Sequence, residues 1–345
     1  MKITELGNRF EYFCVKHNLN CASIKEDRGI SWMFENDPQK LNFTMLKNKL
    51  LLSSMKIITK ALNQVNIQFV FLKGLIEAYD LYPKYCFRPC DDIDILVHKE
   101  DIVHVCLVLA ELGFTYERGI KITEETLVER KSNAISHHFA PFVKKTKYGI
   151  DIIVEVHYCL DEQWNYTFDD FTKELISRKE NIEIDGGVFP ALSKQDRFIF
   201  SMFHCGRDIF FVYENIGFSN KSKYKLKSLI DAILLRCKYD SIYEDLNSRI
   251  NKYGFAPCIR FINEFCYQIF GIRLLKNLNV APSNDAFKEE LCCRLLSTEP
   301  HSVLLSEKYF VNSVFVSITE FLIKKNPCFL CSNEFKGNVK SYAQN

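Results

Sequence analysis

Two aspartates one residue apart offer the clearest chemistry in this chain of 345 residues. Asp92 and Asp94 open the run DIDILV (residues 92–97), whose length and composition predict a buried strand. Alternate side chains of a strand point to opposite faces, so the two carboxylates share one face. They repel each other and lose hydration there, and a bound divalent cation such as Mg²⁺ removes that cost. The alternative is that the carboxylates cap a helix or pair with Arg88.

A third carboxylate lies in the apolar run IDIIVEVH (residues 150–157), which predicts another strand. Glu155 and His157 fall on one face of this strand, while the aliphatic side chains of residues 152, 154 and 156 fall on the other. A carboxylate within so apolar a strand needs a partner. Spacing alone therefore predicts that Glu155 is buried and paired.

The segment before the acidic pair predicts a strand, a turn and a helix. The apolar run 69–72 ends at Lys73-Gly74, a helix follows from Leu75, and Pro83 stops it. Gly74 suits a turn that needs an unusual dihedral angle. Lys73 either holds phosphate as a point charge or is an ordinary lysine at a strand end. Arg88 either contacts phosphate or braces Asp92.

The order of strand, glycine, helix, arginine and Asp-x-Asp strand resembles the polymerase-β-like nucleotidyltransferase superfamily. More closely, Leu72-Lys73-Gly74, Arg88, the DIDILV run and Val154-Glu155-Val156-His157 resemble the family of uncharacterised nucleotidyltransferases. The resemblance covers residues 68–158 well and the following helices weakly. Many members of the superfamily carry Gly-Ser or Gly-Gly at the end of the first strand, whereas this chain has Lys73-Gly74-Leu75.

The resemblance implies an enzyme that transfers a nucleoside monophosphate from an NTP to a hydroxyl-type acceptor and releases pyrophosphate. Asp92, Asp94 and Glu155 would hold two Mg²⁺ ions, with Mn²⁺ as an alternative, and Glu155 would act as a metal ligand or as a general base. Nucleotide and phosphate binding is expected from Lys73, Gly74 and Arg88. For His157 we expect an orienting contact to a carboxylate, with a satisfied histidine or direct chemistry as alternatives.

Relatives in the superfamily modify antibiotics, RNA ends, proteins and peptides, so the resemblance leaves the acceptor open. It also implies that His204 and Asp231 line the cleft, although their positions on hydrophobic helices favour core packing. The departure at Lys73-Gly74-Leu75 favours an alternative of another class, a catalytically inactive nucleotide-binding or protein-interaction module of the same fold. Metal-dependent phosphodiester hydrolysis, with water as the acceptor, is a third hypothesis.

The fold class that follows is α+β, with a small mixed sheet flanked by helices. We expect an N-terminal helical arm (1–66), a catalytic domain (67–191), an all-helical C-terminal domain (192–332) and a polar tail (333–345). Within the catalytic domain, residues 138–143 and 149–157 predict a hairpin, and residues 182–190 predict a second one around Gly186-Gly187. Helices are expected at 99–112, 124–130, 164–177, 224–239, 242–252, 256–270, 285–296 and 306–323.

Composition narrows the class of partner. A net charge of +2 and a pI near 7.8 argue against a long nucleic acid as the main partner. The chain contains no run of about 18 apolar residues and no signal-like start, which predicts a cytoplasmic protein without a membrane partner. The 14 cysteines are scattered and expected to stay reduced. Cys328 and Cys331 have a zinc-like spacing, but no second spaced pair accompanies them.

Overall fold

The structure is a computed structural model, which describes residues 2–31, 37–116, 123–125, 127, 139, 141–160, 168–214, 225–252 and 255–275. The chain divides into two compact units, each assembled from separate segments. The described residues of the first, here called the sheet unit, are those within 46–76 and 90–193. Those of the second, here called the helical unit, lie within 2–45, 77–89 and 194–275.

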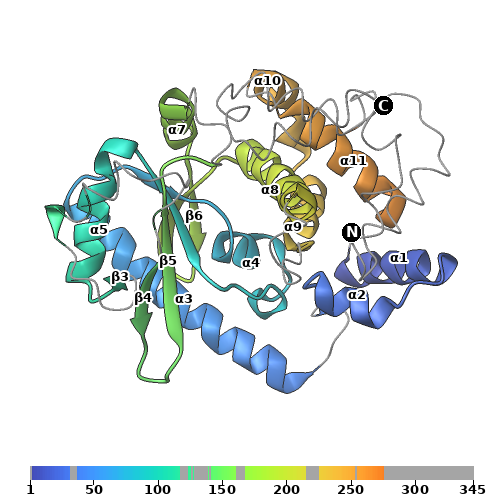
Figure 1. Ribbon diagram of the computed structural model, residues 1–345, viewed down its shortest axis with the longest axis horizontal. Coiled ribbons are helices and arrows are strands. Elements are labelled where there is room, and N and C mark those ends of the chain that lie inside the picture. The colour runs from blue at the N-terminus through green and yellow to red at the C-terminus, as the bar shows by residue number, and fades with distance from the viewer. Residues whose placement is uncertain are drawn as a thin grey trace. The chain divides into compact units, whose positions relative to one another are not determined.

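The sheet unit is built on one mixed sheet of seven strands in the order β3-β4-β5-β2-β1-β7-β6. β2 and β5 are parallel, as are β1 and β7, and the other neighbours are antiparallel. β5 is labelled in Figure 1, and the register of the sheet makes β2 its neighbour. The strands are β1 (Phe69–Phe71), β2 (Ile93–Val97), β3 (Thr115–Tyr116), β4 (Phe142–Lys145), β5 (Asp151–His157), β6 (Glu180–Ile184) and β7 (Gly187–Ala191).

The central strand β2 and its neighbour β1 are buried at every position, as their apolar composition predicts. β5 alternates between buried aliphatic positions and more exposed ones in its first five residues. Phe71 packs against Phe69 and Phe189 with ring centroids 5.5 Å and 6.1 Å apart, which fixes the β1 and β7 side of the core. β4 and β6 have exposed positions, and polar residues occupy all of them.

Both expected hairpins are confirmed. β4 pairs with β5, and the two strands project together in Figure 1. β6 pairs with β7 across Asp185 and Gly186, whose φ angles are +49° and +71°. Two consecutive residues with positive φ are the requirement of a tight hairpin turn whose twist matches that of its strands.

Helices complete the sheet unit and form the other unit. In the sheet unit, α5 contacts β5 and α7 contacts β2. In the helical unit, α8 packs against α9 and α11, and α1 packs against α11 (Figure 1). The helices are α1 (Ile3–Lys16), α2 (Cys21–Asp27), α3 (Pro38–Gln64), α4 (Leu75–Leu81), α5 (Ile102–Glu111), α7 (Phe168–Ser177), α8 (Lys194–Glu214), α9 (Lys227–Lys238), α10 (Leu246–Lys252) and α11 (Ala256–Phe270), with short 3-10 turns η2 (Tyr85–Phe87), η3 (Lys99–Asp101) and η5 (Asp240–Tyr243).

The α+β fold class is confirmed, with a mixed sheet flanked by helices. The helices expected at 285–296 and 306–323, the tail at 333–345 and the pair Cys328 and Cys331 lie outside the described residues. So does most of the helix expected at 124–130. Among the helices that are described, none has the length and apolar character needed to cross a membrane.

Candidate functional site

Strand register brings the acidic residues together. β2 and β5 are parallel neighbours, and Asp94 is the direct partner of Glu155 in their register. His157 lies opposite Leu96, two positions further along the same face. Because alternate side chains share a face, Asp94, Glu155 and His157 all project from one side of the sheet.

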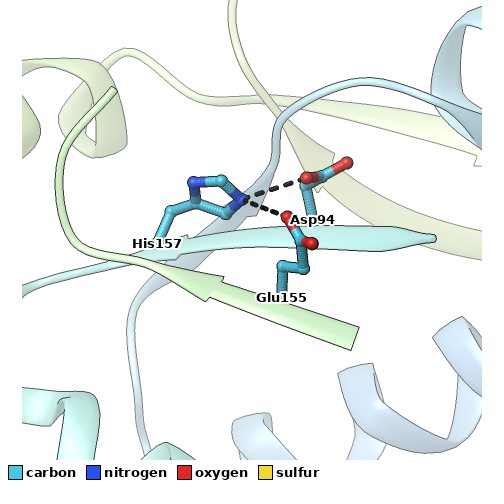
Figure 2. A group of neighbouring side chains, drawn as sticks. All are labelled: Asp94, Glu155 and His157. Carbon is cyan, nitrogen blue, oxygen red and sulfur yellow. Dashed lines mark hydrogen bonds and ion pairs between the residues drawn. The ribbon is translucent and has the colours of Figure 1, made fainter. Parts of the chain in front are cut away.

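The imidazole of His157 lies between the two carboxylates. Its Nε2 atom is 3.0 Å from Asp94 Oδ1 and 3.6 Å from Glu155 Oε2. Figure 2 shows both contacts ending on the same ring nitrogen. One ligand atom from each of the three residues lies within 4.8 Å of the others. This is a cluster compact enough for its members to act on a single ion or proton.

Lys73 brings a positive charge to the same carboxylate. The backbone N–H of Leu72 donates to the carbonyl of Asp94 at 3.2 Å, so the end of β1 lies directly beside the acidic strand. Lys73 Nζ is then 3.4 Å from Asp94 Oδ2. That contact is an ion pair without hydrogen-bond alignment, because the buried Oδ2 atom accepts no hydrogen bond within the described part of the chain.

Gly74 makes this turn feasible. Its φ angle is +74°, a left-handed conformation that costs a side-chain-bearing residue about 1–2 kcal/mol. A Cβ added there would meet only the carbonyl oxygen of Asp92, at 3.7 Å, which is ordinary contact. The glycine is therefore required by its dihedral angle and not by lack of space.

The cluster has a buried base and a more open rim. The side chains of Asp94 and His157 are 0% and 7% exposed, whereas those of Glu155 and Lys73 are 23% and 24% exposed. Groups that must meet a solvent-borne ligand are best placed on the open side. Glu155 and Lys73 satisfy that condition, and Asp94 forms the buried base.

The charged groups of the cluster shift one another's pKa values. Burial raises the pKa of Asp94, but the Lys73 charge and the His157 hydrogen bond outweigh it and hold the pKa below its ordinary value. Burial lowers the pKa of His157, but its bonds to Asp94 and Glu155 outweigh that effect and hold the pKa above its usual range. In this state the positive charges of Lys73 and His157 balance the ionised carboxylates.

Asp92 lies at the edge of the cluster, just before β2 begins. Burial, the negative charge of Asp94 and that of Glu155 raise its pKa to about 6, although the positive charge of Lys73 opposes them. It is not one of the three described residues whose ligand atoms converge. Its neighbour Asp91 points elsewhere, with a 67% exposed side chain that pairs with Lys47 at 3.1 Å.

The donor set fits a divalent cation. Carboxylate oxygens are the ligands that hard cations prefer, and Asp94 Oδ2 is a buried oxygen that accepts no hydrogen bond in the described part of the chain and has the Lys73 ammonium 3.4 Å away. Two carboxylates from neighbouring strands, with a third beside them, also carry enough negative charge for one or two such ions. When bound, the metal would supply charge for the phosphates of a nucleotide.

The structure gives Arg88 a different partner from those expected. Its Nε donates to Asp231 Oδ1 at 3.0 Å, and its Nη2 donates to Oδ2 at 2.6 Å. Tyr82 Oη donates to the same carboxylate at 2.8 Å. The Arg88 and Asp231 side chains are 5% and 2% exposed, so this is a buried ion pair within the helical unit. Asp231 thus packs in the core as the helix pattern favours, and phosphate binding by Arg88 stays a prediction.

A second ionic network, which no local sequence pattern predicts, lies in the helical unit. Arg197 on α8 donates to Glu77 and pairs with Asp80 at 2.8 Å. Lys238, the last residue of α9, and Tyr239, which follows it, also bind Asp80. The partners are more than a hundred residues apart, so no local spacing reveals them. His204 contacts residues 208 and 228 through its Nδ1 atom, in the same unit.

The mixed sheet, with acidic residues that meet on two parallel neighbouring strands, agrees with the nucleotidyltransferase fold expected from the sequence. The chain belongs to the family of uncharacterised nucleotidyltransferases, whose sequence profile matches residues 39–271. The crystal structure of an antigenic nucleotidyltransferase-like protein from Paracoccidioides brasiliensis is similar at 11% identity. The alignment covers 61% of this chain and 92% of that one, with a TM-score of 0.33. A comparison with curated proteins gives no match.

Proposed function

We propose that this protein is a metal-dependent nucleotidyltransferase, which moves a nucleoside monophosphate from an NTP to an acceptor hydroxyl and releases pyrophosphate. The observation that carries the proposal is the pairing of Asp94 with Glu155 in the register of two parallel strands. Membership of the family supports the reaction class, and the donor set supports the metal, for which Mg²⁺ is the expected ion.

Each acidic residue has a role in this proposal. Asp94, at the buried base, would hold a metal ion with Glu155, and Asp92 would contribute to a second ion. Glu155, which is partly exposed, is also placed to accept the proton of the acceptor hydroxyl as that oxygen attacks the α-phosphorus. The oxygen–phosphorus bond to the new acceptor forms, and the bond to pyrophosphate breaks.

Lys73 has two successive partners in the same proposal. Without ligand it neutralises Asp94 across 3.4 Å. A metal ion at that carboxylate would repel the ammonium group, whose side chain is 24% exposed. We propose that Lys73 then turns to the β- and γ-phosphates, as a compact positive charge suits. Gly74 allows the chain to turn close to those phosphates.

The second candidate is a nucleotide-binding module without turnover. It is favoured by the contacts of Lys73 and His157, which already neutralise Asp94, and by the absence of a hydroxyl residue after Gly74. The two candidates differ in whether a product forms, and not in whether a nucleotide binds.

The test combines binding with turnover on the full chain. Calorimetric titrations with each NTP, with and without Mg²⁺, measure binding, and pyrophosphate release in the presence of fractionated cell lysate measures transfer. The proposal requires metal-dependent NTP binding together with pyrophosphate release that EDTA abolishes. Binding without release, in all fractions, would favour the inactive module, and release without any labelled product would indicate hydrolysis.

A further inference from the structure

His157 makes more contacts than a residue that only orients a carboxylate would need. An imidazole that only holds a carboxylate in place needs one contact, but Nε2 lies near oxygens of both Asp94 and Glu155 (Figure 2). The ring is anchored at the end of β5 and is 7% exposed, so the nitrogen is held in position before any ligand arrives. We propose that His157 is itself a metal ligand through Nε2, and that this nitrogen gives the site a preference for Mn²⁺ over Mg²⁺.

The distances suit neighbouring ligands of one ion. For metal–ligand bonds of about 2.1 Å, two ligands at right angles are about 3.0 Å apart. The separation of Nε2 from Asp94 Oδ1 is 3.0 Å, and its separation from Glu155 Oε2 is 3.6 Å. As a ligand, Nε2 would release to solvent the proton that it shares with Asp94, and its lone pair would then face the ion. Small side-chain adjustments at the more exposed Glu155 complete the fit.

The choice of metal follows from the kind of donor. Mg²⁺ strongly prefers oxygen ligands and water, whereas imidazole suits transition metals. Mn²⁺ accepts carboxylates as well as imidazole, so a set of two carboxylates and one imidazole favours it over Mg²⁺. This inference rests on the proposed function, since it assigns a further ligand and an ion to the same site.

The experiment uses the full chain and the metals alone. Electron paramagnetic resonance of free Mn²⁺ gives its affinity, and competition with Mg²⁺ gives the affinity of the second ion. Electron spin echo envelope modulation of bound Mn²⁺ then detects a coordinated imidazole nitrogen directly. We expect that nitrogen signal in the wild-type chain, where it requires no mutation and no turnover.

Two substitutions complete the design. In His157→Gln, we expect the nitrogen signal to vanish and the Mn²⁺ affinity to fall about 10- to 100-fold, with a much smaller change for Mg²⁺. His104→Gln is the matched control, because it removes an exposed imidazole from α5 in the same unit. It should leave both the signal and the affinity unchanged. Circular dichroism checks the fold of both variants.

The outcomes separate this inference from the proposed function. Mn²⁺ bound tightly but without imidazole coupling would overturn the role of His157 and leave the nucleotidyltransferase proposal standing. Equal losses of Mn²⁺ and Mg²⁺ affinity in His157→Gln would overturn the metal preference, because an orienting residue affects both ions alike. No binding of either ion to the wild-type chain, alone or with a non-hydrolysable NTP, would overturn both proposals.

Discussion

Removing the carboxylate of Asp231 tests what Arg88 does in this fold. The substitution Asp231→Ala leaves the guanidinium of Arg88 buried without its charge partner and removes the acceptor of the Tyr82 hydroxyl. Both members of the ion pair are at least 95% buried, so solvent offers little compensation. Breaking such a pair costs about 3–5 kcal/mol. For a unit of about 150–250 residues, that lowers the melting temperature by roughly 6–20 °C.

The assay is urea unfolding followed by circular dichroism, with two comparison variants. Glu5→Ala breaks the exposed pair with Arg9 in the same unit, and it should cost less than about 1 kcal/mol. The double variant Arg88→Met with Asp231→Leu removes both charges and replaces them by apolar side chains of similar size. It should recover most of the stability that Asp231→Ala loses.

Two results would refute this reasoning. A loss below about 1 kcal/mol in Asp231→Ala would show that the pair is not the desolvated interaction that its burial implies. A double variant that is stable yet binds NTP at least tenfold more weakly would show that Arg88 contacts phosphate. The sequence-based prediction for Arg88 would then hold, and its pairing with Asp231 would describe only the state without nucleotide.

Other substitutions test individual parts of the account. Lys73→Met should weaken NTP binding about tenfold or more, since one charge-assisted contact is lost. It should strengthen Mg²⁺ binding, since the competing positive charge beside Asp94 is gone. Calorimetry measures both affinities, and a change of both in the same direction would contradict the proposal that Lys73 has two successive partners. Gly74→Ala should cost about 1–2 kcal/mol, much like Gly186→Ala in the β6–β7 turn, but only the former should lower nucleotidyl transfer. Burial raises the pKa of Asp80, but Arg197 and Lys238 outweigh it and hold the pKa below its ordinary value. The ionised form of Asp80 therefore stabilises the fold above about pH 4, and this stabilisation is lost as the pH falls through the lowered pKa. Between about pH 5 and 3, the unfolding free energy should therefore decrease less in Asp80→Asn than in the wild-type chain.

Much of the sheet could be predicted because its signals are local. The strand that carries Asp94, the strand that ends before Lys73, and both hairpins follow from alternation and turn residues within short windows, whereas Asp92 lies just outside the strand predicted to include it. The adjacency of β2 and β5 is not local, and it is implied only by the resemblance to known nucleotidyltransferases, which assigns Asp94 and Glu155 to the same ions. Once the register of that pairing is given, with Asp94 opposite Glu155, parity puts Glu155 and His157 on the same face as Asp94.

The ionic contacts could not be predicted, because their partners are distant in sequence. Nothing near Arg88 indicates that its partner lies 143 residues away on α9. The contact of His157 Nε2 with two carboxylates depends on the side-chain rotamers of all three residues. The packing of the sheet selects those rotamers, and the spacing of residues in the sequence does not reveal them. Sequence patterns located the acidic residues, and the three-dimensional register determined which of them meet.

The most direct measurement compares two neighbouring aspartates of opposite parity. Asp94→Asn removes the charge of the buried base of the site but keeps an acceptor for His157, whereas Asp91→Asn removes an exposed charge paired with Lys47. Pyrophosphate release from NTP in the presence of Mg²⁺ should fall at least about 100-fold in Asp94→Asn and stay near the wild-type rate in Asp91→Asn, with both chains folded. Wild-type release by the folded Asp94→Asn chain would contradict the claim that this carboxylate holds the metal.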